Sequence, residues 1–128
     1  MNLLLVAFGG ALGSVARYLM GGWVYTLAGK PEFPLGTFVV NMIGCFVIGV
    51  LNQFAESQQI VAPQFRLLLI VGFLGGFTTF SSFGYETVDL LREGETFQAI
   101  ANAVLQVVIG LSACAFGIWL GRMIWGES

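Results

Sequence analysis

The sequence predicts an all-α integral membrane protein with four transmembrane helices per subunit and a broken third helix. Charged residues make up 9% of its 128 residues and hydrophobic residues 57%, whereas a soluble domain averages about 25% charged residues. The few charges are spaced so that four long apolar stretches remain between them. The third stretch also contains a cluster of glycine and hydroxyl residues that weakens a helix near its centre. These three observations predict a chain whose main solvent is lipid.

Four stretches of the chain are long enough and apolar enough to cross a membrane. Residues 33–55, 67–85 and 96–121 carry no charge, and residues 2–29 carry only Arg17. Each stretch reaches the roughly 20 residues that a helix needs to cross a hydrocarbon core about 30 Å thick. The predicted spans are about 2–28, 33–55, 64–91 and 97–124.

Little of the chain is left outside these spans, so we expect a single membrane domain over residues 1–128. The longest connection is a polar segment at residues 56–63. The first span is not expected to be a cleaved signal peptide, because no Lys or Arg precedes it and its apolar run continues to Ala28. Signal peptides have a basic start and a shorter apolar core.

Composition also argues against several classes of function. The net charge is −2 with no basic cluster, which argues against a nucleic-acid partner. The chain has no His, which removes the commonest general base and metal ligand and disfavours an enzyme. Its two cysteines, Cys45 and Cys114, fall inside predicted spans, where we interpret them as small apolar packing residues.

The charges of the connecting segments favour neither orientation in the membrane. One side carries Arg66 and Arg122 and the other carries Lys30 and Arg92, although cytoplasmic loops normally hold an excess of Lys and Arg. Either cellular machinery fixes the orientation, or the chain inserts both ways and pairs with its inverted copy. The second interpretation predicts an antiparallel, dual-topology homodimer.

Glycine pairs at four-residue spacing predict close contacts between helices. Such pairs let two backbones approach closely in lipid. They can serve packing within one subunit or between two subunits. The pairs are Gly9 with Gly13, Gly72 with Gly76, and Gly117 with Gly121.

The centre of the third span carries the most informative stretch, 72–84. The dipeptide Gly75-Gly76 weakens the helix there. The four hydroxyl residues that follow, at 78, 79, 81 and 82, can bind backbone groups that a broken helix leaves free. Unwound backbone at membrane depth survives where it is buried in protein or lines a wet cavity. Its carbonyls can hold a cation, and half-helix N-termini attract anions. The alternative is a continuous helix whose small residues pack against a neighbour.

Other polar and aromatic residues lie close to this predicted break. Phe80 and Phe83 are three residues apart and share a helix face, so their ring edges could offer weak positive potential to an anion. In the second span, Asn41 could bridge two helices or donate to a passing anion. In the fourth span, Asn102 and Gln106 share a face, and they could extend a polar track or hold two helices together.

One charged residue lies well inside a predicted span. Arg17 in the first span is costly to bury and is therefore a candidate functional residue. It could focus anions in a vestibule or pair with Glu86, which lies near one end of the third span.

These residues resemble the Fluc (CrcB) family of fluoride channels over the whole chain. The similarity includes Gly10-Ala-Leu-Gly-Ser-Val-Ala-Arg17 and Gly36-Thr-Phe-Val-Val-Asn-Met-Ile-Gly44. Its most specific part is Gly75-Gly-Phe-Thr-Thr-Phe-Ser-Ser-Phe83 in the third span. The resemblance implies an antiparallel homodimer with two pores in a bacterial inner membrane, as a multi-pass protein.

The resemblance also implies the site residues. A structural sodium ion at the dimer centre would be held by the backbone carbonyls of Gly75 and Thr78 in both subunits. Phe80 and Phe83 would present ring edges to fluoride, and Asn41 would donate a hydrogen bond to it. At Asn102 the family often has Tyr, so this chain departs from the pattern there. The implied fluoride pathway consists of Asn41, Phe80, Phe83, Ser81, Ser82, Thr79, Asn102, Gln106, Arg17, Glu86 and Thr37.

The expected function is passive export of cytoplasmic fluoride, giving fluoride resistance. Fluoride holds its water tightly, so a pore must replace that water with many weak donors. Hydrogen fluoride enters uncharged, dissociates in the cytoplasm, and the anion leaves down the membrane potential. A small dual-topology proton-coupled cation or drug exporter is the nearest alternative, although it needs a carboxylate deep in the membrane. A non-conducting assembly subunit is a further alternative, and it would need no broken span.

Overall fold

The computed structural model describes residues 1–58 and 62–127, and all of its regular secondary structure is helical. Four helical units are long and apolar enough to cross a membrane, and the third of them comprises the consecutive helices α3 to α5, Pro63–Arg92. The predicted all-α class with four candidate spans is therefore confirmed. The elements are α1 (Asn2–Leu27), α2 (Leu35–Ser57), α3 (Pro63–Phe65), the π-helix η1 (Arg66–Leu74), α4 (Gly75–Phe77), α5 (Phe80–Arg92) and α6 (Thr96–Trp125).

The ends of the spans lie within about two residues of the predicted positions. Local signals explain several of them. Proline at position 63 starts the third unit, where its missing N–H is not needed. Gly29 and Gly94 adopt positive φ values just after helices end. The polar connection predicted at residues 56–63 includes residues 59–61, which lie outside the described residues.

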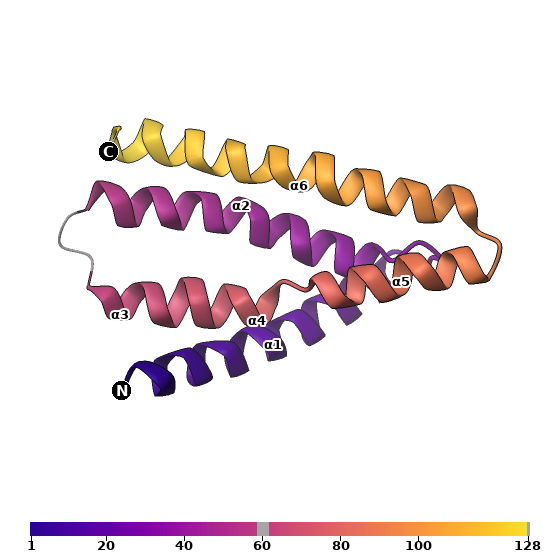
Figure 1. Ribbon diagram of the computed structural model, residues 1–128, viewed down its shortest axis with the longest axis horizontal. Helices are drawn as coiled ribbons and strands as arrows, with labels where there is room; N and C mark the ends of the chain where they lie inside the picture. The colour runs from indigo at the N-terminus through magenta and orange to yellow at the C-terminus, as the bar shows by residue number, and fades with distance from the viewer. Residues whose placement is uncertain (59–61, 128) are drawn as a thin grey trace.

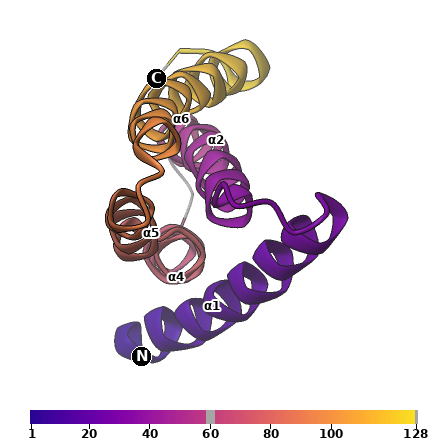
Figure 2. The same ribbon diagram turned by 90° about the vertical axis from the view of Figure 1, so that its right-hand side faces the viewer.

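The helices form two pairs rather than one closed bundle. Helix α2 packs along α6, whereas α1 packs against η1 and α4. Helix α5 lies beside α6, and α1 crosses the third span and the start of α2 obliquely (Figures 1 and 2). The N- and C-termini lie at the same end of the molecule (Figure 1). An even number of crossings places both termini at the same end.

The glycines of the four-residue pairs lie at contacts within the subunit. A Cβ atom at Gly9 would collide with the carbonyl oxygen of Leu68, and one at Gly13 with that of Phe73. In the other helix pair, a Cβ atom at Gly117 would collide with the carbonyl oxygen of Phe46. Of the two roles that the sequence left open for these glycines, the structure shows packing within one subunit.

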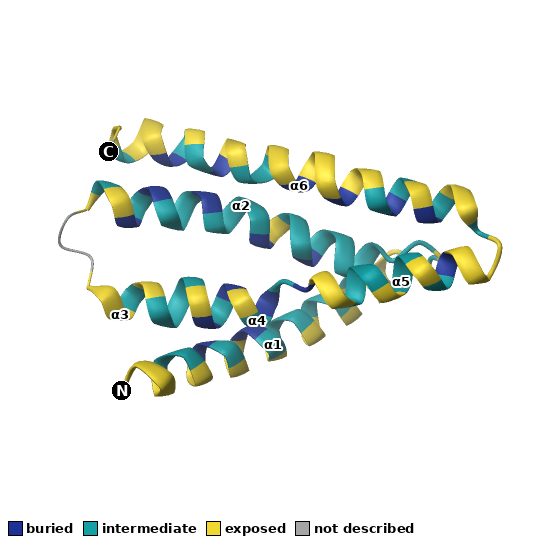
Figure 3. Cartoon of the chain, viewed as in Figure 1, coloured by how far each residue is buried: buried dark blue, intermediate teal, exposed yellow. Residues whose placement is uncertain are grey.

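Many large apolar residues are exposed, and the buried core is small. Figure 3 shows exposed and half-buried residues along every helix. The core cluster centres on Val40, Leu74 and Phe77, where α2 meets the third span. Exposed residues include Phe8 and Trp23 on α1. Such a surface is unstable in water, so it faces lipid or another protein subunit.

Replacement of Gly13 by Ala tests the close contact between α1 and the third span. We expect Gly13→Ala to lower the free energy of unfolding by roughly 1–3 kcal/mol, because the added methyl group overpacks a tight contact. Gly22→Ala is the matched control, since no atom lies within 4 Å of a Cβ at Gly22 on the same helix. That control should leave stability unchanged or raise it, because Ala favours helix. Thermal unfolding in detergent measures both, and equal midpoints would contradict the contact.

Candidate functional site

The third span is interrupted at Thr78 and Thr79. Helix α4 ends at Phe77, and both threonines adopt extended backbone conformations before α5 begins at Phe80. The predicted break is therefore confirmed, but it lies just after the glycine pair rather than at it. Gly75 keeps helical angles, with φ −61° and ψ −36°. The helix breaks at the threonines instead, because their side chains offer the backbone alternative hydrogen-bond partners.

Threonine hydroxyl groups satisfy the helix ends on both sides of the break. The Leu74 carbonyl accepts both the Thr78 N–H at 3.0 Å and the Thr78 hydroxyl at 2.9 Å, in the last turn before the break. The Thr79 hydroxyl oxygen accepts the backbone N–H of Ser82 at 3.1 Å and so caps α5. The same oxygen lies 3.2 Å from the Ser81 hydroxyl. The hydroxyl cluster predicted to support a break supports it in this way.

Asn41 on α2 binds both backbone groups of Thr79. Its side-chain oxygen accepts the Thr79 N–H at 2.9 Å, and its side-chain nitrogen donates to the Thr79 carbonyl at 3.1 Å. The nitrogen also donates to Gln106 Oε1 at 3.3 Å. An extended residue in a membrane span has two unpaired backbone groups, and this one amide pairs with both.

The break also frees the carbonyls of Gly75 and Thr78. In an α-helix these would accept the N–H groups of residues 79 and 82. Those N–H groups donate instead to Asn41 Oδ1 and to the Thr79 hydroxyl. Free carbonyl oxygens of unwound backbone are ligands that membrane proteins use for Na⁺. The residues present therefore fit the sodium site that the family resemblance implied.

Phe80 and Phe83 form an edge-on aromatic pair on the first turn of α5. Their ring centroids are 5.4 Å apart, with an interplanar angle of 61°. This geometry directs the positive edge of one ring toward the other and leaves further edges free. Phe80 is 81% exposed in the single subunit, so nothing in this subunit covers it.

Two amide side chains of α6, Asn102 and Gln106, are buried near the break. Asn102 is fully buried and Gln106 is 9% exposed. Asn102 donates to the Thr87 hydroxyl at 2.9 Å, which joins α6 to α5. The sequence left open whether Asn102 extends a polar track or links helices, and this bond is a link between helices. Thr87 was not among the predicted site residues, although the short connection between α5 and α6 places it at the same depth as Asn102.

Two cavities meet at the break. The break cavity, about 380 Å³, has Thr79 in its wall. The arginine cavity, about 350 Å³, has Thr79 in its wall as well, so the two spaces share this residue. The break cavity is also lined by the predicted residues Asn41, Phe80, Phe83, Gln106, Gly75 and Thr78. The arginine cavity is also lined by the predicted residues Arg17, Thr37 and Ser82.

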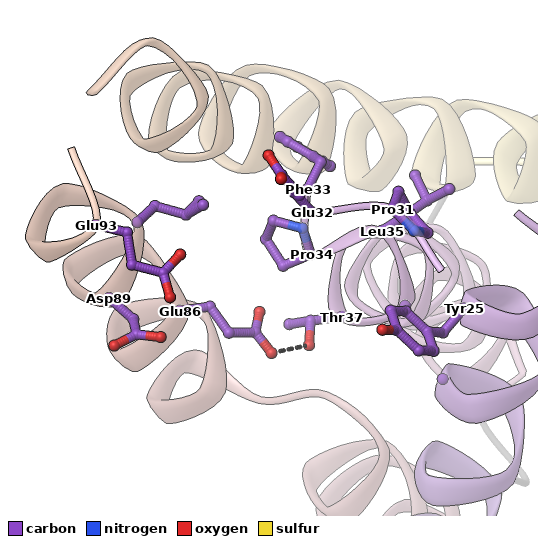
Figure 4. Close-up of a pocket in the computed structure, with 13 residues that line it drawn as sticks. Tyr25, Pro31, Glu32, Phe33, Pro34, Leu35, Thr37, Glu86, Asp89 and Glu93 are labelled. Carbon is purple, nitrogen blue, oxygen red and sulfur yellow. Dashed lines mark hydrogen bonds between the residues drawn. The ribbon is translucent and has the colours of Figure 1, made fainter. Parts of the chain in front are cut away.

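A third cavity, which we call the acidic cavity, occupies about 450 Å³ near the start of α2. Figure 4 shows the carboxylates of Glu86, Asp89 and Glu93 on one side of it and Thr37 and Tyr25 on another. Thr37 also lines the arginine cavity. The acidic, arginine and break cavities therefore form a series in which neighbours share Thr37 and then Thr79.

The proposed ion pair between Arg17 and Glu86 is not formed. Glu86 Oε1 accepts the Thr37 hydroxyl at 2.7 Å (Figure 4), and Oε2 has no hydrogen-bond partner. Opposite charges suggested that Arg17 pairs with Glu86, but the hydrogen-bond partner of the Glu86 carboxylate is the Thr37 hydroxyl. The alternative, in which Arg17 lines a vestibule, agrees with its place in the wall of the arginine cavity. Cys45 and Cys114 are free thiols, as expected.

Comparison with known proteins gives a consistent assignment. Residues 4–118 match the family model described as CrcB-like protein, Camphor Resistance (CrcB). The chain belongs to the CrcB family. The matched residues include the break, Asn41 and all three cavities, so the family assignment covers the whole candidate site.

Several CrcB relatives are named fluoride-specific ion channel FluC. The relative from Geotalea uraniireducens is 46% identical over 123 residues, which cover 96% of this chain and 95% of the relative. The relative from Geobacter sulfurreducens is 48% identical, with 95% and 94% coverage. The relative from Methylobacillus flagellatus is also 48% identical, with 95% coverage of both chains. All three names describe ion channels, in agreement with the expectation that the chain is not an enzyme.

Proposed function

We infer that this CrcB chain is a fluoride-specific ion channel, and we propose that fluoride follows the three neighbouring cavities. The observation that carries the pathway is that Thr79, at the break, lines both of two cavities whose walls hold the predicted residues. Fluoride would pass Glu86 and Thr37, then Arg17 and Ser82, and then the aromatic pair. A passive route of this kind needs no energy-coupling domain.

The lining of the break cavity suits a small, strongly hydrated anion. Hydroxyl groups, amide N–H groups and aromatic edges are weak donors that can replace water without trapping the ion. Both N–H groups of the Asn41 amide are already occupied, by the Thr79 carbonyl and by Gln106. Fluoride would replace the longer of these bonds, at 3.3 Å to Gln106, and so exchange one acceptor for another.

We also propose that two oppositely inserted subunits form the working channel, with two pores. Phe80 is 81% exposed, and polar backbone at Gly75 and Thr78 is free at the same level. A second subunit would cover this face and complete the pathway. The equal numbers of Lys and Arg on the two sides of the chain suit insertion in both orientations.

A sodium ion between the two breaks would hold the subunits together. The free carbonyls of Gly75 and Thr78 support this proposal, because two inverted subunits would bring two such pairs to one point. The ion would supply positive charge to otherwise unpaired carbonyl dipoles.

Fluoride efflux from liposomes tests the function and the pathway together. Valinomycin-dependent efflux of fluoride, but not of chloride, is expected for the unmodified protein. Phe80→Ile and Asn41→Ala should each reduce the rate by roughly tenfold, the factor for about 1.4 kcal/mol, while the dimer persists. Phe97→Ile and Asn52→Ala are matched controls, because neither residue lines the three cavities. Unchanged efflux in both test variants would remove their residues from the pathway.

Labelling in intact cells tests dual topology. We would place a single cysteine at Thr96, an exposed residue that begins α6, after replacing Cys45 and Cys114 by Ala. An impermeant maleimide added outside should label about half of the copies, because the connecting charges favour neither orientation. Labelling of all copies or of none would exclude insertion in both orientations.

Removal of sodium tests the central ion. Liposomes prepared with N-methylglucamine as the replacement cation should lose fluoride efflux once bound sodium has dissociated, since the carbonyls would then repel one another. Added sodium should restore it. Full efflux from protein shown by atomic emission to be free of sodium would contradict the site.

A further inference from the structure

A chain of hydrogen bonds leads away from the break cavity to Asn102 and Thr87, which line none of the three cavities. It begins at the Thr79 N–H, which donates to Asn41 Oδ1. Asn41 then donates to Gln106 Oε1 at 3.3 Å, and Gln106 donates to Asn102 Oδ1 at 3.5 Å. Asn102 donates to the Thr87 hydroxyl at 2.9 Å. The chain crosses from α2 to α6 and then to α5.

Both ends of this chain have a fixed direction. At one end, the backbone N–H of Thr79 can only donate, so Asn41 must present its oxygen there. At the other end, the Thr87 hydroxyl donates to the Phe83 carbonyl at 2.7 Å. A carbonyl can only accept, so the Thr87 oxygen is left to accept from Asn102. All the intervening amides then point in one consistent direction.

We propose that Thr87 and Asn102 are positioning residues for the ion pathway, acting through Gln106. Asn102 is fully buried, and with its nitrogen bound to Thr87 it directs its oxygen at Gln106. Gln106 therefore directs its own oxygen at Asn41, in the wall of the break cavity. Without Thr87, the Asn102 amide loses its preferred direction, and Gln106 can turn its two N–H donors toward the cavity.

The functional consequence follows from the balance of donors and acceptors. A reversed Gln106 would face Asn41 donor to donor, and that repulsion would displace Asn41 from Thr79. It would also add two further N–H donors to the cavity wall, and an anion bound by more donors is held too tightly to conduct fast. The proposal rests on the proposed fluoride function; it adds Thr87 to the predicted residues and gives Asn102 a role that needs no contact with the ion.

The experiment measures fluoride efflux per folded channel for Thr87→Val, which removes the hydroxyl at nearly constant volume. The rate is expected to fall by roughly tenfold, the scale set by one buried unpaired donor, and Thr87→Ser is expected to restore it. Thr26→Val is the matched control, because the Thr26 hydroxyl likewise donates to a carbonyl four residues earlier, at an exposed site. A purely structural role would lower the yield or the thermal midpoint without changing the rate per folded channel.

A double-mutant cycle tests action through Gln106. In a Gln106→Leu background, Thr87→Val should cause no further loss, because the group it orients is absent. Unchanged efflux in Thr87→Val, or fully multiplied losses in the double variant, would overturn the proposal. If Thr87→Val does not fold, Asn102→Leu is expected to show the same loss, and a normal rate there would also overturn it. Absence of fluoride efflux from the unmodified protein would instead refute the proposed function.

Discussion

The backbone of Thr79 imposes the requirement on which the rest of the structure depends. Its N–H and carbonyl lie in the middle of a membrane span and outside any helix, where lipid offers no partner. Asn41 binds both groups, and this allows the span to remain broken. Because the Thr79 N–H is committed to Asn41, the carbonyl of Gly75 is free for another ligand. One amide thus satisfies the break and leaves the Gly75 carbonyl free for the proposed cation.

The same requirement explains why helices distant in sequence meet at this level. Asn41 comes from α2, and its second N–H is bound by Gln106 from α6. Buried amides in lipid need hydrogen-bond partners as much as backbone groups do. The Asn41 amide that pairs with Thr79 is therefore itself paired with Gln106. The cavities follow from this arrangement, since side chains that bridge helices cannot also fill the space beside them. Thr79 therefore lines two cavities and lies between two helices.

Composition and run length were sufficient to predict four spans, and the glycine and hydroxyl cluster was sufficient to predict a break. The break occurs at Thr78 and Thr79 rather than at Gly75, because threonine side chains supply alternative partners whereas glycine only weakens the helix. Long-range pairing was harder to predict. Glu86 binds Thr37 and not Arg17. The choice between these two partners depends on the distances between helices, which cannot be read from the sequence.

The open face of the subunit is a consequence of the broken span. A helix in lipid hides its backbone within itself, but a break exposes carbonyls on at least one side. Here that side includes Gly75, which is exposed and has no neighbouring atom within 4 Å of its Cβ position, and Phe80, which is 81% exposed. Free carbonyls facing hydrocarbon would cost several kcal/mol each. Something polar must therefore cover the break in a membrane, and the proposed inverted copy, with its own free carbonyls and a shared cation, would meet that need.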